Sequence, residues 1–163
     1  MEWRRGEYAI STDPARLDLD VIHGFLSRSY WAEGIPRQTV ERSIEHSLPF
    51  GVYQRTGAGE RQVGFGRVIS DRATFAYLAD VFVLEELRGQ GLGAWMIECM
   101  IAHPELQSLR RWALVTRDAH ALYRKFGWLE LAAPERHMER LPAGRYARDR
   151  ETVPTPRAPE NAE

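Results

Sequence analysis

A short glycine-rich stretch, RGQGLG at residues 88–93, contains the residue types that point most directly to chemistry. It follows the apolar run FAYLADVFVL and precedes a segment with the apolar spacing of a helix. The first turn of a helix has backbone N–H groups without internal partners, and the helix dipole adds positive potential there. Glycines let the chain curl around a bulky anion, and Arg88 adds a charged donor. The stretch predicts a phosphate-binding loop, with a tight packing turn as the alternative.

Two common nucleotide-binding motifs do not match this loop. The dinucleotide fingerprint needs G-x-G-x-x-G and an acidic residue about 20 positions further on. Here the spacing is G-x-G-x-G, and the following segment, RRWALVT, contains no Asp or Glu. A Walker A loop needs Gly-Lys-Ser/Thr, whereas Gly93 is followed by Ala94 and Trp95. The phosphate ligand is therefore of another kind.

Asp80 is the one ionisable carboxyl in the otherwise apolar run from Phe75 to Leu84. A carboxyl that loses water inside a central strand is expected to have a raised pKa, which suits a general base. The alternative is a structural carboxylate that pairs with Arg67 or with a loop N–H. The sequence leaves both interpretations open.

The elements that position these residues follow a mixed α/β order. Alternating and helical spacings predict a strand, two helices, a run of strands, and then strand, helix, strand, helix and terminal strands. The expected strands are at 8–11, 50–55, 62–70, 75–84 and 110–116, with one or two weaker ones in LELAAPERHMERL, residues 129–141. The expected helices begin near residues 19, 36, 92 and 118. The unit from Phe75 to Thr116 predicts two parallel strands joined by a right-handed helical crossover.

Composition limits the class of protein. A chain of 163 residues with 44% hydrophobic residues suits one domain, expected over 1–142, with a disordered tail over 143–163. A net charge of -1 argues against a nucleic-acid binder. No apolar stretch has the length of a signal or a membrane span, so we expect a cytoplasmic protein without membrane contact. The five histidines lack ligand spacing and Cys99 is alone, so no metal is expected.

RGQGLG after a strand that ends in DVFV, with ALYRKFGW about thirty residues later, resembles the GCN5-related N-acetyltransferase (GNAT) family. The resemblance covers roughly Tyr8 to Leu141. It implies a single mixed sheet flanked by helices, with splayed central strands, and acetyl-coenzyme A as co-substrate. It assigns the pyrophosphate to Arg88 and to the loop, whose backbone donors are Gly89, Gln90, Gly91, Leu92, Gly93 and Ala94. The pantetheine arm is assigned to the backbones of Phe82 and Val83.

The same resemblance suggests how acetyl transfer is carried out. Tyr123 matches the family tyrosine whose hydroxyl protonates or hydrogen-bonds the departing sulfur, and a core tyrosine is the alternative. A backbone N–H at Phe82 or Val83 is expected to stabilise charge on the acyl oxygen. Asp80 is the candidate base. Thr116 stands where the family commonly has an asparagine that contacts the pantetheine arm, so that contact is expected only in part.

The acceptor is expected to be the primary amine of a small molecule, with transfer in a ternary complex. In this family the loop between the first two helices and the late strands contact the acceptor. Tyr30 and Trp31 suit an aromatic wall, Glu33 suits a cationic group, and Phe75 and Tyr77 suit one face of the pocket, with core packing or solvation as the alternatives. A regulatory module that binds acetyl-coenzyme A without catalysis is the alternative function. The family makes a homodimer plausible.

Overall fold

The chain folds around one six-stranded sheet in a computed structural model that describes residues 1–57 and 59–140. The strands lie in sequence order, from β1 to β6. Their bounds are β1 Glu2–Arg5, β2 Tyr8–Ser11, β3 Leu48–Thr56, β4 Gly59–Ser70, β5 Phe75–Val83 and β6 Arg111–Ala113. Neighbouring strands are antiparallel except β5 and β6, which are parallel. The sheet is therefore mixed, as the sequence predicted.

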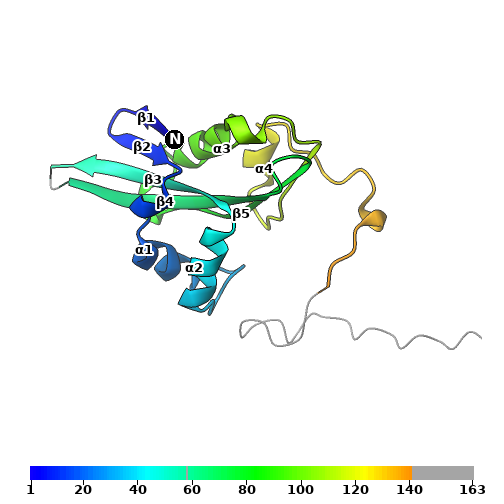
Figure 1. Ribbon diagram of the computed structural model, residues 1–163, viewed down its shortest axis with the longest axis horizontal. Coiled ribbons are helices and arrows are strands. Elements are labelled where there is room, and N and C mark those ends of the chain that lie inside the picture. The colour runs from blue at the N-terminus through cyan, green and yellow to red at the C-terminus, as the bar shows by residue number, and fades with distance from the viewer. Residues whose placement is uncertain (58, 141–163) are drawn as a thin grey trace, which may run out of the picture.

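Helices cover both faces of this sheet (Figure 1). The helices α1 and α2 lie on one face, and α3 and α4 lie on the other. Their bounds are α1 Leu19–Leu26, α2 Arg37–Glu45, α3 Leu92–Ile101 and α4 His120–Arg124, with short 3-10 turns at η1 Pro14–Arg16, η2 Glu85–Leu87, η3 Pro104–Leu106 and η4 Pro134–Arg136. Asp18 caps α1, because its carboxylate accepts the N–H groups of Asp20 and Val21. This arrangement is the α/β fold of the prediction.

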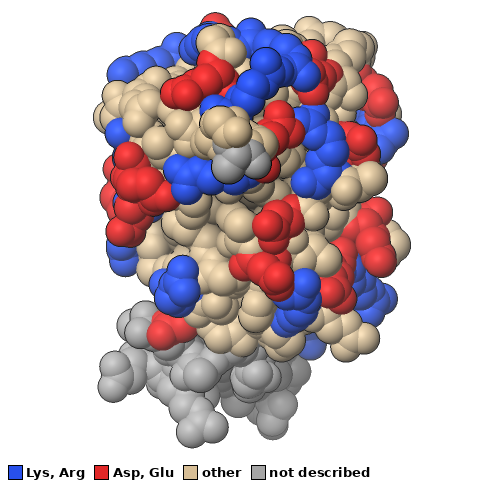
Figure 2. All heavy atoms as spheres, turned by 90° about the vertical axis from the view of Figure 1, so that its left-hand side faces the viewer, with Lys and Arg blue, Asp and Glu red and all other residues tan. Residues whose placement is uncertain are grey.

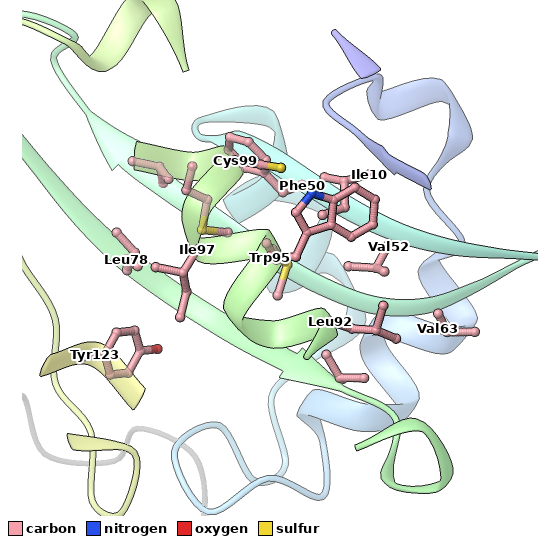
Figure 3. Close-up of a cluster of buried hydrophobic side chains, with 14 of the residues drawn as sticks. Ile10, Phe50, Val52, Val63, Leu78, Leu92, Trp95, Ile97, Cys99 and Tyr123 are labelled. Carbon is pink, nitrogen blue, oxygen red and sulfur yellow. The ribbon is translucent and has the colours of Figure 1, made fainter. Parts of the chain in front are cut away.

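Two hydrophobic clusters hold the layers together. The larger lies between the sheet and α3, where Met96, Ile97 and Met100 are fully buried (Figure 3). The smaller lies between the sheet and the two N-terminal helices and includes Phe65 and Phe82 of neighbouring strands. Cys99 is a free, buried thiol on α3, as its apolar surroundings predicted.

The parallel strands β5 and β6 pair over only three residues each. Phe75–Tyr77 of β5 face Arg111–Ala113 of β6, and β5 then continues to Val83 without a partner on that side. The helix α3 makes the crossover between them. The splayed parallel unit that the sequence predicted is therefore present, and its open end lies beside the N-terminus of α3.

Three sequence expectations on strands need correction. An N-terminal strand, Glu2–Arg5, was not expected, because its exposed charged residues carry no apolar signal. The strand expected over 110–116 is limited to Arg111–Ala113, because β5 diverges after Tyr77. The strands expected in 129–141 are absent over 129–140, where the chain forms only a 3-10 turn. The expected tail, 143–163, lies outside the described residues.

Charges of both signs are mixed on one face of the surface. Figure 2 shows acidic and basic side chains interspersed on the face that contains the β3–β4 hairpin end, without a field of one sign. Within residues 1–57 and 59–140, every helix is too short or too polar to cross a bilayer.

Candidate active site

A cleft of about 1010 Å³ opens where β5 and β6 diverge. Three stretches that are distant in sequence form its walls: the end of α1 with its following loop, the run from the end of β5 through η2 and the glycine loop to the start of α3, and the segment from 117 to α4. The cleft contains most residues that the sequence assigned to cofactor binding, namely Phe82, Val83, Arg88, Gly89, Gly91, Leu92, Gly93 and Ala94. The size is that of a site for a large ligand.

The glycine loop presents backbone amides to this cleft. Gly89 and Gly91 both have a φ of 80°, a left-handed conformation that other residues adopt only with strain. Gly91 is the N-cap of α3, and no side chain in the described part of the chain caps this helix. The N–H groups of the first helical turn therefore remain available to a ligand, and the helix dipole favours an anion there.

Two side chains of the loop are already engaged. The Arg88 Nε donates to the Val83 carbonyl at 3.2 Å, which ties the loop back to the end of β5. The Gln90 side chain accepts the Tyr8 hydroxyl at 2.9 Å and does not line the cleft. The Arg88 Nη1 also forms an ion pair with the Glu85 carboxylate at 3.6 Å, which is exposed to solvent, so a bound anion would compete with Glu85 for this guanidinium. Gln90 can take part only through its backbone.

The peptide group of Val83 faces the open side of β5. The next residue, Leu84, donates its N–H to the Val63 carbonyl of β4 at 2.9 Å. Successive peptide groups of a strand point to opposite edges, so Val83 points away from β4. The bond from Arg88 to its carbonyl agrees with that direction. The Val83 N–H is therefore directed to the side that β6 leaves open.

Asp80 lies in a β-bulge within β5. The register of β4 with β5 shifts between Phe65 and Arg67, so Asp80 and Val81 together face a single residue of β4. Asp80 has a φ of 56°, which aspartate tolerates better than most residues. Its carboxylate accepts the Arg67 Nε at 2.6 Å and the Trp31 Nε1 at 3.3 Å. Both carboxylate oxygens are thus used to hold the bulge. These contacts are those of a structural carboxylate paired with Arg67, which was the alternative to a general base.

Tyr123 lies on the wall of the cleft, on the first helix after β6. Its side chain is buried, and in Figure 3 its hydroxyl points away from α4 toward the interior of the molecule. The ring packs edge-to-face against Trp128, with centroids 5.8 Å apart. Burial raises the pKa of the Tyr123 phenol to about 12, and the nearby Tyr30 and Tyr77 add to the effect. The phenol therefore stays protonated at neutral pH.

The acceptor side of the cleft is aromatic. Tyr30 and Trp31 pack edge-to-face at 4.9 Å and both keep about two-fifths of their surface exposed. The Tyr30 hydroxyl accepts the Arg117 N–H at 3.1 Å, and the Arg117 guanidinium lies 3.8 Å from the centre of the Tyr30 ring. Phe25 stacks on Phe82 with ring centres 3.8 Å apart. The loop after α1 is thereby tied to the segment after β6.

Three residues assigned to acceptor binding lie elsewhere. Glu33 does not line the cleft, and one of its carboxylate oxygens is buried. Phe75 is at the other end of β5, paired with the start of β6. Tyr77 is half-buried, with its pKa raised first by burial and then by the Asp80 carboxylate. The structure brings none of the three into the cleft.

The cleft also contains residues that sequence reasoning missed. They include Phe25, Arg28, Ser29, Arg117, Ala119 and Lys125. Their proximity to the glycine loop depends on tertiary packing, so no local pattern marks them. Thr116, where an asparagine was expected, uses its hydroxyl to accept the Ala119 N–H at 3.0 Å. That bond begins the turn into α4 and does not extend toward the cleft opening.

Comparison with known proteins decides the family. The model of the acetyltransferase (GNAT) domain matches residues 49–130. A Gibberella zeae protein, named as a candidate acetyltransferase, is 37% identical over 142 residues, which are 76% of this chain and 79% of that protein. The chain belongs to the GNAT acetyltransferase family. A GNAT-family crystal structure from Xanthomonas campestris pv. campestris has a TM-score of 0.80 and 48% identity, covering 86% of this chain and 96% of that one.

A more distant structural neighbour shares the fold. The crystal structure of a candidate acetyltransferase from Clostridium acetobutylicum, determined with acetyl-coenzyme A, has a TM-score of 0.53 and 17% identity, over 80% of this chain and 98% of that one. At that identity the likeness concerns the fold alone. In this chain the residues themselves suit such a cofactor. The uncapped N-terminus of α3 suits a diphosphate, and the edge of β5 that β6 leaves unpaired beyond Tyr77 suits an extended amide chain.

Proposed function

We propose that this GNAT protein transfers an acetyl group from acetyl-coenzyme A to a primary amine of a small molecule, directly within a ternary complex. The observation that carries the proposal is one cleft that contains three groups: the free amides at the start of α3, the outward N–H of Val83, and the hydroxyl of Tyr123. These are the groups that acyl transfer from a thioester requires.

Each part of the cleft has a role in this proposal. The amides of Gly91 to Ala94, with Arg88, hold the diphosphate of the cofactor, whose thioester supplies the acetyl group. The Val83 N–H lies on the side where negative charge develops on the acyl oxygen, and a fixed backbone donor needs no reorganisation during the reaction. The amine attacks in its neutral form, so that the C–N bond forms as the C–S bond breaks, and the proton that the amine releases ends on the departing sulfur to give the free thiol. The Tyr123 hydroxyl donates a hydrogen bond to that sulfur as it departs. Asp80 holds the bulge that sets the direction of these peptide groups.

Direct transfer is supported by the state of the single cysteine. Cys99 lies on the buried side of α3, and burial raises the pKa of its thiol to about 11. The reactive form of a cysteine is the thiolate, which is scarce at neutral pH with such a pKa. The thiol also does not line the cleft. An acetylated cysteine is therefore not part of the proposed route.

A small acceptor is supported by the contacts at the aromatic side. Tyr30 and Arg117 connect the loop after α1 to the segment after β6, 87 positions apart, so the wall beside Trp31 is held in place. A rigid aromatic wall suits a compact cationic amine. A protein segment would need a longer open groove at this point.

The proposal is tested by thiol release with a panel of amines and peptides, with calorimetry on acetyl-coenzyme A alone. We expect heat of binding, and turnover on at least one small amine. Binding without turnover on any amine would support the regulatory module. A peptide that outcompetes every small amine would move the acceptor class to protein. No heat of binding would overturn the assignment of the cleft.

A further inference from the structure

The charged side chains that line the cleft leave a surplus of positive charge. Three carboxylates line it, and each has an arginine at 3.6 Å: Glu85 has Arg88, Glu86 has Arg61, and Asp118 has Arg117. Two further cations line the cleft, Arg28 and Lys125. Neither forms an ion pair within the part of the chain that the structure describes. The cleft therefore has two cations that await a negative charge from a ligand.

These two cations lie on opposite faces of the sheet. Lys125 directly follows α4, on the face that α3 covers, beside the helix start to which the diphosphate is assigned (Figure 1). Arg28 follows α1 on the other face, two residues before Tyr30 and the aromatic wall of the acceptor side. The phosphates of coenzyme A thus account for Lys125, whereas Arg28 belongs to the side of the acceptor.

The backbone of Arg28 is held in place at the cleft. Its N–H donates to the Phe25 carbonyl at 3.1 Å, and the Phe25 ring stacks on Phe82 with centres 3.8 Å apart. The next residue, Ser29, is buried, and its hydroxyl donates to the Leu26 carbonyl at 2.7 Å. The Arg28 side chain is exposed and starts from this fixed base. A binding group on a rigid base loses less conformational freedom when it takes up a ligand.

Arg117 supplies a second guanidinium on the same side. It lies 3.8 Å from the centre of the Tyr30 ring, and its backbone N–H donates to the Tyr30 hydroxyl. A guanidinium that stacks on a ring keeps the N–H groups of its edge for a planar or tetrahedral anion. Its pairing with Asp118 is longer than a hydrogen bond, and both side chains are mostly exposed, so this pair is weak. An anion of the acceptor can replace Asp118 there.

The acceptor side has no carboxylate to spare for a second positive charge. Asp80, which the Trp31 Nε1 contacts at 3.3 Å, is bound to Arg67 at 2.6 Å. Asp118 already faces Arg117. An acceptor with two amino groups would therefore meet arginines without a free carboxylate among the described residues that line the cleft. An acceptor with one amine and one anionic group matches the charges that are present.

We propose, on the basis of the acetyl transfer proposed above, that the acceptor is a small primary amine that also carries a carboxylate or a phosphate, and that Arg28 and Arg117 bind this anionic group. Both kinds of anion fit a guanidinium with two parallel hydrogen bonds. The anion fixes one end of the acceptor at the aromatic wall and leaves the amine free to meet the thioester. The two arginines are thus specificity residues for the acceptor.

The first test compares amines that differ in one group only. The pairs are β-alanine with β-alaninamide and phosphoethanolamine with ethanolamine, and putrescine is the amine with two cations. We expect kcat/KM to be about tenfold or more higher for the anionic member of at least one pair, as for a hydrogen bond to a charged group. The anion raises the pKa of the amine, which by itself would favour the uncharged member. Equal values within both pairs, or the highest value on putrescine, would overturn the proposal.

The variant Arg28→Gln tests the residue itself. We expect the ratio within the discriminating pair to fall by about tenfold, while calorimetry shows unchanged binding of acetyl-coenzyme A. Arg42→Gln is the matched control, because Arg42 is an exposed arginine of α2 outside the cleft and its loss changes the net charge equally. It should keep the ratio of the natural protein. If Arg28→Gln kept the ratio and instead weakened the binding of acetyl-coenzyme A, this arginine would belong to the cofactor, and the proposal would be wrong.

Chemical modification gives a measurement that does not depend on turnover. Phenylglyoxal reacts with exposed guanidinium groups, and mass spectrometry locates the modified arginines. With coenzyme A present, we expect β-alanine or phosphoethanolamine to slow the modification of Arg28 several-fold and to leave Arg42 unaffected, whereas their uncharged counterparts protect neither. Protection of Arg28 without acetylation of any amine would support the anion site and contradict the proposed transfer. Acetylation without protection of Arg28 by either anion would contradict the anion site alone.

Discussion

Removal of the Tyr123 hydroxyl is the most direct test of the chemistry proposed for the cleft. In Tyr123→Phe the ring keeps its packing against Trp128, and only the O–H is lost. We expect turnover to fall while the affinity for coenzyme A is nearly unchanged, because the diphosphate is held by the amides of α3. The expected fall follows from the pKa of the phenol.

The phenol of Tyr123 is a weak acid, with a pKa of about 12. An ordinary thiol has a pKa of about 8.5, so complete transfer of the phenol proton to the thiolate would be uphill by roughly 5 kcal/mol. Stabilisation by a hydrogen bond to the departing thiolate is therefore the larger contribution. A hydrogen bond to a charged group contributes about 1.5–3 kcal/mol, which corresponds to a roughly 10- to 150-fold fall in turnover.

The assay is thiol release at saturating amine. The ratio of the turnover rate of the natural protein to that of Tyr123→Phe is measured at pH 7 and at pH 9. Because the raised pKa keeps the phenol protonated at both values, we expect the same ratio at each. Tyr53→Phe is the control. It removes another buried hydroxyl, which has no hydrogen-bond partner among the described residues and lies on β3. Unchanged turnover in Tyr123→Phe, or a ratio that falls to one at pH 9, would refute the role of the Tyr123 hydroxyl as a hydrogen-bond donor to the departing sulfur.

Four further predictions follow from the backbone. Asp80→Asn keeps a residue that tolerates the left-handed φ, so we expect turnover to fall less than about tenfold. If the rise of turnover with pH were lost in this variant, Asp80 would be the general base. Gly91→Ala adds a Cβ at φ 80°, and we expect about tenfold weaker coenzyme A binding by calorimetry, with Gly6→Ala, another positive-φ glycine, binding normally. Gly64→Ala places a Cβ 2.9 Å from the Phe82 carbonyl and should lower the free energy of unfolding by about 1–3 kcal/mol. Gly24→Ala, on α1 with free space, should raise it by about 0.5–1 kcal/mol.

The cofactor half of the cleft could be predicted from the sequence because its signals are local. Alternating glycines after an apolar run and before a helix define the position of the free amides whatever the rest of the chain does. The resemblance assigned the backbones of both Phe82 and Val83 to the pantetheine arm. Only Val83 faces the open side, because peptide groups alternate and that of Phe82 points to Phe65 of β4. The direction of a side chain, in contrast, depends on contacts with residues that are distant in the sequence. Gln90 lies in the loop, yet its amide is used by Tyr8, which is 82 positions away in the sequence.

The acceptor half could be predicted only in part. Tyr30 and Trp31 reach the cleft, but Trp31 also bonds to Asp80, and no spacing rule joins two residues 49 positions apart. The pairing of Asp80 with Arg67 could be named in advance, because neighbouring strands were expected to place them together. The β-bulge at which this pair lies could not be predicted. The bulge, in which Asp80 has a positive φ, depends on the register of β4 with β5.

The shortness of β6 explains the cleft. If β6 ran parallel to β5 as far as Val83, its peptide groups would pair with the outward N–H of Val83, and no extended amide chain could enter there. Because β6 ends at Ala113, the chain crosses toward Tyr30 and begins α4, which brings Tyr123 to the opening. One feature, the early end of a strand, thus both opens the edge of β5 to a pantetheine-like arm and places the phenol beside that opening.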